Sequence, residues 1–310
     1  MSKPKFLVLM AAYNGASYIK DQIHSILNQE GVDVTLFISL DLSTDETLEI
    51  ISALAHSDMR IFILPHNGLI FGGAGPNFYR LISDVDFTGF DYVSFADQDD
   101  VWRADKLFRA YQILMVSNAQ GYSSNFTAFW PNGRRLDVKK AYPQRRWDFI
   151  FESAGPGCTY VVRSDLALAL KRFILEAGEG LLKIEFHDWL TYAYARFQGY
   201  HWVIDDWSSI EYRQHMSNQL GVNSGVRPFL LRVKKILNGY GISQSLLIAN
   251  LIAANSMNIV QRGLLNGRLG YVWLSFQCCE CRRRKIDRVM FFISCLLLAI
   301  IHPLRSTPTK

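Results

Sequence analysis

Short apolar runs alternate with helix-like segments through the first hundred residues, and this alternation limits the folds open to the chain. The apolar runs occupy residues 6–12, 34–40, 61–64 and 92–96. Between the first three of them, isoleucine and leucine recur at intervals of three or four residues. Such runs are typical of buried strands, and such intervals are typical of helices. We therefore predict an α/β fold with a Rossmann-like, mostly parallel sheet and helices on both faces.

Three carboxylates follow the fourth apolar run within four positions, at Asp97, Asp99 and Asp100. Open α/β sheets bind their ligands at the carboxyl ends of strands, which is where these residues stand. Asp97 and Asp99 are two residues apart, so an extended backbone would direct both side chains to the same side. Two hard oxygen ligands suit Mg²⁺ or Mn²⁺. An aspartate-rich turn, with carboxylates capping backbone donors, explains the cluster equally well at this point.

Two common nucleotide-binding motifs are absent from the sequence. No Gly-x-Gly-x-x-Gly follows the first apolar run, and no Walker sequence occurs anywhere. The sequence therefore disfavours both a dinucleotide-dependent dehydrogenase and a P-loop enzyme. The first run is followed instead by Tyr13-Asn14-Gly15, and the second by Asp41. The ring of Tyr13 suits stacking on a base, whereas Asp41 taken alone also suits a simple turn.

Composition bounds the class of protein and its compartment. Hydrophobic residues make up 49% of the 310 residues and charged residues 20%, as in a globular chain. No basic region with an apolar stretch precedes the first strand, so we expect a cytoplasmic protein. Cys278 and Cys281 are spaced like a ligand pair but lack a second pair or a nearby histidine. We therefore expect free thiols rather than a zinc site.

Charge is distributed unevenly along the chain. Residues 1–100 hold 5 Lys and Arg against 14 Asp and Glu, whereas residues 221–310 hold 13 against 2. The basic end predicts an anionic partner, either membrane lipid or nucleic acid. There, residues 282–288 include five cations and precede an apolar run of 13 residues, 289–301. That run is shorter than the ~17–25 residues of a spanning helix. A core helix is one interpretation, and an interfacial anchor beside anionic headgroups is the one we favour.

Ordered motifs over roughly residues 5–220 resemble the family 2 glycosyltransferases. These motifs are Ala11-Ala12-Tyr13-Asn14-Gly15, Asp41-Leu42-Ser43-Thr44-Asp45, Asp97-Gln98-Asp99, His187-Asp188-Trp189 and Gln214-His215. Leu40 stands where the family has the first Asp of Asp-Asp-x-Ser-Thr-Asp, and His187 stands where it has Glu. The string from Asp97 to Trp102, with Asp105-Lys106-Leu107, is most similar to bacterial rhamnosyltransferases.

The resemblance implies a GT-A fold and a role for each motif. The donor-binding residues would be Ala12, Tyr13, Asn14, Asp41, Asp97, Gln98 and His215. Mg²⁺ or Mn²⁺ would be held by Asp97, Asp99 and His215 and would neutralise the diphosphate that leaves. Asp188 would be the general base, and one base without a covalent intermediate implies inversion. Asp188 as a helix cap and His215 as a surface histidine remain the alternatives.

We therefore expect an inverting, metal-dependent glycosyltransferase that makes a bacterial surface polysaccharide such as O-antigen. The favoured donor is dTDP-rhamnose, and the acceptor is lipid-linked or a polysaccharide. Residues 1–222 would form the catalytic domain, and residues 223–310 a basic, helical extension. That extension would hold the protein peripherally on the anionic inner face of the cell membrane, without a nucleic-acid partner. A nucleotidyltransferase and a non-catalytic nucleotide-sugar-binding protein remain the alternatives.

Overall fold

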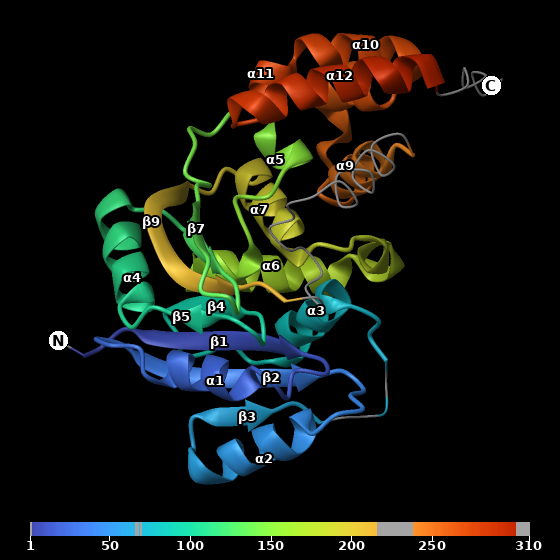
Figure 1. The fold of residues 1–310 in the computed structure, drawn as a ribbon. Coiled ribbons are helices and arrows are strands. Elements are labelled where there is room, and N and C mark those ends of the chain that lie inside the picture. The colour runs from blue at the N-terminus through green and yellow to red at the C-terminus, as the bar shows by residue number, and fades with distance from the viewer. Residues whose placement is uncertain (1, 66–67, 69, 216–237, 302–310) are drawn as a thin grey trace. The chain divides into compact units, whose positions relative to one another are not determined.

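The computed structural model describes residues 2–65, 68, 70–215 and 238–301, and Figure 1 draws its helices and strands. Internal contacts divide the chain into two compact units. The first unit comprises Met1–Ala141 with Ala154–Gly221, and the second comprises Tyr142–Ser153 with Val222–Lys310. The boundary that we predicted between residues 222 and 223 lies outside the described residues. The division into a catalytic domain and an extension therefore stays a prediction.

The first unit alternates strands and helices. Its elements are β1 (Lys5–Ala12), α1 (Ile19–Leu27), β2 (Asp33–Leu40), α2 (Thr47–Ser57), β3 (Ile61–Ile63), α3 (Ala74–Asp84), β4 (Tyr92–Ala96), β5 (Val101–Trp102), α4 (Lys106–Ser117), β6 (Gly121–Phe129), β7 (Arg135–Val138), the short turn η1 (Gly157–Thr159), β8 (Val161–Arg163), α6 (Ser164–Glu176), η2 (Gly178–Lys183), α7 (His187–Phe197) and β9 (Trp202–Arg213).

Every regular element in the described part of the second unit is a helix. Its elements are α5 (Asp148–Phe151), α9 (Tyr240–Leu251), η3 (Ala254–Ser256), η4 (Ile259–Leu264), α10 (Gly267–Phe276), α11 (Cys278–Cys281) and α12 (Lys285–Ile301). The prediction of a helical C-terminal segment is confirmed for these residues.

A single sheet of nine strands forms the centre of the first unit, counted over the residues that the structure describes. Eight of the strands follow the order β3-β2-β1-β4-β8-β6-β9-β5. The ninth strand, β7, pairs with β6 and lies outside this order. The first four strands in this order are parallel, and Met10 is level with Ile38 on one side and Ala96 on the other. The predicted α/β fold with a Rossmann-like parallel arrangement is therefore confirmed for the part of the chain that carries most motifs.

The strand order reverses at β1. From β1 the chain moves through β2 to β3 and then crosses back to β4, on the other side of β1 (Figure 1). Crossovers between parallel strands are right-handed, so α1 and α2 lie on one face and α3 lies on the other. In agreement, α1 contacts α2, whereas α3 contacts α6 and α7. Sheets of this type bind ligands at the carboxyl ends of the strands that flank the reversal, here β1 and β4.

Buried apolar side chains explain why the predicted strands and helices form. Residues 6–10 of β1 have no solvent exposure, as expected for a central strand covered on both faces. Ile19, Ile23 and Ile26 form the buried face of α1. Each such side chain contributes about 1.5–3 kcal/mol by leaving water. This core fixes the strand ends, and the strand ends place the loops that carry the polar motifs.

The remaining half of the sheet combines parallel and antiparallel pairs. β8 is antiparallel to β4 and to β6, and β9 is parallel to β6. Near its end β9 pairs with β5, which directly follows the carboxylate cluster, through Val101 and Glu211. This pairing brings His215 beside Asp99, although 116 residues separate them along the chain.

Helices pack closely in the second unit. α10 contacts α12 and η4, and α5 contacts α9 and α11. A β-carbon on Gly270 would lie 2.2 Å from the carbonyl oxygen of Gly263, so only glycine permits this approach of α10 to η4. Throughout the described part of the chain, every helix is too short or too polar to cross a bilayer.

Candidate active site

The loops after β1 and β2 are joined by hydrogen bonds. Ala12 ends β1 and is buried, whereas the side chain of Tyr13 is 53% exposed. Asn14 has a φ of 46°, in the left-handed region that asparagine tolerates better than most residues. Its amide donates to Ser43 Oγ at 3.0 Å, and its Oδ1 accepts from the amide of Thr44 at 2.8 Å. These bonds fix the turn that leaves the Tyr13 ring accessible at the carboxyl end of β1.

Asp41 is buried at the end of β2, with 5% of its surface exposed. Its carboxylate accepts hydrogen bonds from the backbone amides of Leu42 at 2.8 Å, Phe71 at 3.0 Å and Gly72 at 3.1 Å. A carboxylate has about four acceptor positions, so these three bonds leave one for a ligand. Asp41 therefore holds the connection before α3 in place at the same edge of the sheet as Tyr13.

Gln98 bonds to the backbone of Tyr13 in both directions. Its Oε1 accepts from the Tyr13 amide at 2.7 Å, and its Nε2 donates to the Tyr13 carbonyl oxygen at 2.7 Å. A β-carbon on Gly15 would lie 2.3 Å from Gln98 Oε1, so the glycine is needed for this approach. Gln98 thus ties the end of β4 to the end of β1.

Two carboxyl groups of the acidic cluster, the half-buried Asp97 and the buried Asp100, lie beside a buried thiol. Ligand atoms of Asp97, Asp100 and Cys158 all lie within 4.8 Å of one another. Burial, followed by the charge of Asp99, raises the pKa of Asp97 to about 7. Burial, again followed by Asp99, raises the pKa of Asp100 well above its ordinary value. Carboxylates packed in this way repel each other, and a divalent cation would relieve the repulsion.

His215 contacts the other carboxylate of the cluster. Its Nε2 lies 2.7 Å from Asp99 Oδ2, and its ring stacks on Tyr18 with centroids 4.8 Å apart. Arg213, the last residue of β9, donates from Nε to the backbone oxygen of Asp99 at 2.9 Å. Its amide also donates to Asp100 Oδ1 at 3.2 Å. The end of β9 therefore brings together Asp99 and His215, two of the three residues predicted to hold a metal.

The residues of this cluster fit a divalent cation. Asp97 and Asp99 provide carboxylate oxygens and His215 a ring nitrogen, donor types that Mn²⁺ accepts in full and Mg²⁺ through its oxygens. Among the described residues, the ligand atoms grouped within 4.8 Å are those of Asp97, Asp100 and Cys158, whereas Asp99 pairs with His215. The joint role of Asp97, Asp99 and His215 as metal ligands therefore stays a prediction. Asp100 Oδ2 is buried, and among the described residues the neighbouring Cys158 thiol is the one donor near it. A buried acceptor that lacks a strong donor costs free energy unless a donor or a cation reaches it.

Asp188 lies in the first turn of α7. Its Oδ1 accepts from the amide of Trp189 at 2.6 Å, and its carboxylate also accepts from the amide of Gly157. Burial raises the pKa of Asp188 to about 6. The N-cap position of α7 belongs to Phe186 rather than to Asp188. Gly157, whose amide donates to Asp188, is followed by Cys158, which lies with Asp97 and Asp100, so the first turn of α7 and the acidic cluster meet at η1.

His187, which replaces the family's glutamate, is buried with 7% exposure. Its ring stacks on Phe78 with centroids 3.7 Å apart, and a β-carbon on Gly157 would lie 2.4 Å from its Nε2. Burial lowers its pKa to about 3, so the ring is neutral at physiological pH. His187 therefore packs behind Asp188 as an uncharged aromatic group and adds no negative charge to the site.

Sequence reasoning assigned no ligand or catalytic role to Asp100, Lys106 or Cys158. Asp100 and Lys106 are fully buried, and burial lowers the pKa of Lys106 to about 7. The Lys106 Nζ lies 3.2 Å from the centroid of the Trp102 ring. Cys158 reaches the cluster from η1, and no feature of its local sequence marks it.

Known proteins resemble the chain in sequence and in fold. The chain is 40% identical to the dTDP-rhamnosyl transferase RfbG of Shigella flexneri, over 93% of this chain and 99% of that protein. It is 29% identical to the putative teichuronic acid biosynthesis glycosyltransferase TuaG of Bacillus subtilis, over 52% of this chain and 62% of that protein. The structure of S. aureus TarS 1–349 with UDP matches with a TM-score of 0.57 over 94% of this chain and 90% of that one. At 14% identity, that last likeness concerns the fold alone.

The family assignment follows from these matches. A family model described as glycosyl transferase family 2 covers residues 7–161, and the alignment with RfbG covers nearly all of both chains. The predicted GT-A-like fold and the predicted enzyme class are thereby confirmed. The chain belongs to glycosyl transferase family 2.

Proposed function

We propose that the protein is an inverting, metal-dependent rhamnosyltransferase. It would transfer rhamnose from a deoxythymidine-diphosphate donor to a hydroxyl group of a lipid-linked or polysaccharide acceptor, in the synthesis of a bacterial surface polysaccharide such as O-antigen. The observation that supports the proposal most directly is that Asp188 accepts a hydrogen bond from the amide of Gly157, whose neighbour Cys158 lies with Asp97 and Asp100. A metal-binding cluster and an isolated carboxylate facing the same site are what displacement of a diphosphate requires.

The donor assignment rests on the alignment with RfbG and on the loops after β1 and β2. RfbG is described as a dTDP-rhamnosyl transferase and aligns over 99% of its length. The exposed ring of Tyr13 offers a stacking surface for a base. Asp41 lies in the next loop and keeps an acceptor position for a donor group on a base edge. We assign the nucleoside end of the donor to these loops, with Asn14 holding them together.

Departure of the diphosphate is assigned to the acidic cluster. When bound by Asp97, Asp99 and His215, Mg²⁺ or Mn²⁺ would neutralise the charge on the leaving diphosphate. The pKa of Asp97 is raised to about 7, so this carboxyl group can lose its proton near neutral pH when a cation binds. Arg213 holds the backbone of Asp99 and Gln98 holds that of Tyr13, so the two halves of the donor site keep a fixed spacing.

Asp188 would accept the proton of the attacking hydroxyl. A pKa of about 6 leaves most of the carboxylate ionised at neutral pH and makes it a stronger base than an ordinary aspartate. The amides of Gly157 and Trp189 fix its orientation. Because a single base acts and the protein forms no bond to the sugar, the anomeric configuration inverts.

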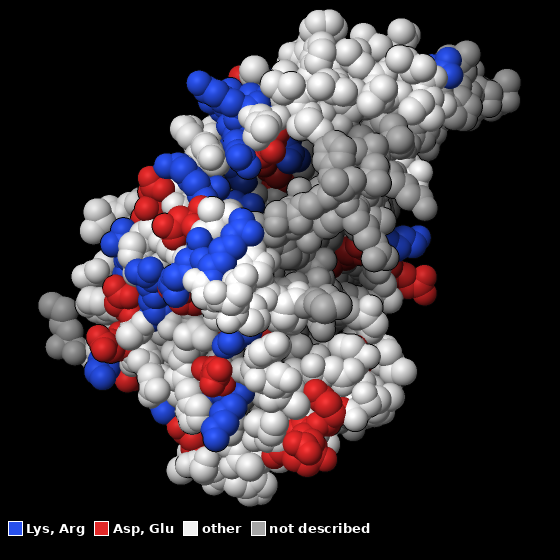
Figure 2. All heavy atoms as spheres, in the orientation of Figure 1, with Lys and Arg blue, Asp and Glu red and all other residues white. Residues whose placement is uncertain are grey.

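The membrane proposal rests on the exposed apolar face of the second unit. Leu269 and Phe276 on α10 are 75% and 69% exposed, and Val289, Ile293 and Ile300 on α12 are 57%, 45% and 72% exposed. The α12 residues are four and seven positions apart and therefore share one helix face. Figure 2 shows few charged side chains over α10 and α12 on the visible side. We propose that this face rests on the inner surface of the cell membrane, near a lipid-linked acceptor.

Calorimetric titration with dTDP, in the presence and absence of Mn²⁺, tests the proposed donor site. The wild-type protein is expected to bind dTDP more tightly with Mn²⁺, and Asp99→Ala is expected to lose that gain. Asp33→Ala removes an exposed carboxylate at the start of β2 and serves as the matched control, which should behave as wild type. Equal dTDP affinity with and without Mn²⁺ in the wild-type protein would contradict the metal role.

A further inference from the structure

A cavity of about 530 Å³ lies within the second unit, apart from the residues assigned to the donor site. Its lining includes Tyr142 and five cations, Arg145, Arg283, Arg284, Lys285 and Arg288. None of the residues that line it carries a carboxylate. Binding cavities for small ligands measure about 300–1,000 Å³, so this volume is sufficient for a compact charged group.

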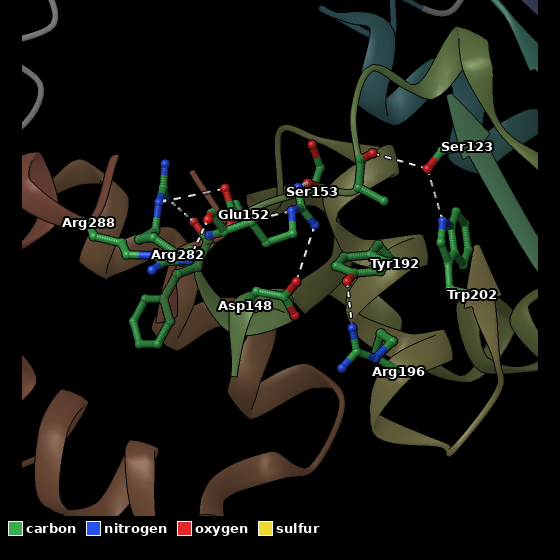
Figure 3. Close-up of polar contacts among 12 residues, drawn as sticks. Ser123, Asp148, Glu152, Ser153, Tyr192, Arg196, Trp202, Arg282 and Arg288 are labelled. Atoms are coloured by element: carbon green, nitrogen blue, oxygen red, sulfur yellow. Dashed lines mark hydrogen bonds and ion pairs between the residues drawn. The ribbon is translucent and has the colours of Figure 1, made fainter. Parts of the chain in front are cut away.

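Arg283 is a buried residue of the cavity lining and is held in place by carboxylates. It is 5% exposed, its Nη1 lies 3.3 Å from Asp148 Oδ2, and its amide donates to Glu152 Oε1 at 2.7 Å. Arg288 donates to the backbone oxygens of Arg282 at 2.9 Å and Arg283 at 2.7 Å. Figure 3 shows these contacts around Glu152, Asp148 and Arg288. The arginines are therefore held by α5 and by their own backbone before any ligand arrives.

Three of the lining cations lack a carboxylate partner among the residues that the structure describes. Within the described ranges, Arg284, Lys285 and Arg288 have no carboxylate at ion-pair distance. Arg284 and Lys285 are exposed, and Arg288 is half-buried on neutral carbonyl groups. The first turn of α12 contributes its positive end to the same place, since Lys285 and Ile286 both line the cavity. Asp287 lies in that turn but does not line the cavity.

We propose that this cavity binds a phosphate or diphosphate group. Arginine forks match the oxygen geometry of phosphate, and several of them with a helix start favour a doubly charged anion over a single carboxylate. A nucleic acid would need an extended basic stripe rather than one local cluster. The phosphate could belong to a lipid headgroup or to a soluble molecule, because both present the same oxygens. The proposal does not depend on the donor, the metal or the base assigned above.

Titration of the full-length protein with inorganic pyrophosphate tests the site, with chelator present and at low ionic strength so that no metal can bridge the anion to the acidic cluster. The double variant Arg284→Gln, Lys285→Gln removes two cations that make no side-chain hydrogen bond to a described residue, so it should fold. We expect its affinity to fall at least about tenfold, because hydrogen bonds to charged groups are strong. Arg262→Gln, on an exposed cation of η4 outside the cavity, is the matched control and should bind within about twofold of wild type.

Vesicles of phosphatidylcholine, with and without phosphatidic acid, distinguish the two sources of phosphate. If the double variant loses both pyrophosphate binding and the added affinity for phosphatidic acid, the group is a lipid headgroup. If it loses pyrophosphate binding alone, the cavity serves a soluble phosphate. If wild-type protein binds no pyrophosphate, or Arg262→Gln weakens binding as much as the double variant, the site does not exist.

Discussion

Replacing Asp188 with asparagine separates its catalytic role from any structural one. The substitution keeps the size of the side chain and one amide acceptor but removes the group that takes the proton. General base catalysis contributes about 10²–10⁴-fold to a rate. If Asp188 is the general base, as we propose, turnover of Asp188→Asn should fall by at least about a hundredfold.

The raised pKa of Asp188 also predicts how Asp188→Asn changes the free energy of unfolding. Burial raises the pKa of Asp188 from 3.8 to about 6, so the folded protein holds its proton more tightly than the unfolded chain. Ionising Asp188 therefore costs stability as pH rises from about 4 to about 6. This cost is at most about 3 kcal/mol, and less because the carboxylate is partly exposed. Above pH 7 the free energy of unfolding of Asp188→Asn should equal or exceed that of wild type.

Steady-state turnover and urea denaturation, measured on the same preparations at pH 8, test both expectations. Glu49→Gln neutralises an exposed carboxylate in the first turn of α2 and is the matched control, with wild-type rate and stability. Wild-type kcat/KM should fall about tenfold per pH unit below about pH 6, as the base becomes protonated. If Asp188→Asn keeps its rate per folded molecule and loses stability, Asp188 is a structural residue and the base lies elsewhere.

Three further results are expected. Chelator, or Asp99→Ala, should abolish turnover while the circular dichroism spectrum stays that of wild type. Full activity in chelator would show that the acidic cluster is an aspartate-rich turn rather than a metal site. Gly121→Ala would place a β-carbon 2.0 Å from the buried Trp202 ring. The free energy of unfolding, measured by urea denaturation, should fall by about 1–3 kcal/mol. An unchanged midpoint of urea denaturation would show that the ring can move. Ile293→Gln with Ile300→Gln should weaken vesicle binding in high salt, because apolar contacts are not screened; unchanged binding would remove the apolar face from the membrane proposal.

Local patterns predicted the parallel core and its loops. The apolar runs that became β1, β2, β3 and β4 are short and uninterrupted, and a strand end in such a sheet fixes where the next polar residue lies. Asp41 and Asp97 were therefore identifiable before any coordinates, whereas Asp188, in the first turn of α7, was identified through the family resemblance of His187-Asp188-Trp189. The residues that contact these aspartates from distant segments could not be predicted in this way, because such contacts depend on strand order and packing rather than on local spacing.

Cys158 and the second unit illustrate that limit. Cys158 reaches Asp97 and Asp100 only because η1 precedes β8, which pairs beside β4, and its local sequence carries no signal for this. Residues 142–153 lie in the middle of the chain but belong to the second unit, where Asp148 and Glu152 pair with Arg283. The basic run was visible in the sequence as surface charge, whereas the carboxylates that bury one of its arginines were not.

Release of nucleotide diphosphate from a panel of nucleotide sugars is the most direct test of the central claim. Purified protein is incubated with each donor and Mn²⁺, and both free nucleotide diphosphate and free pyrophosphate are measured. We predict that dTDP-rhamnose gives the fastest release of dTDP, that chelator stops it, and that no pyrophosphate forms. Pyrophosphate as the product would instead indicate a nucleotidyltransferase, and binding of donors without release of either product would indicate a non-catalytic protein.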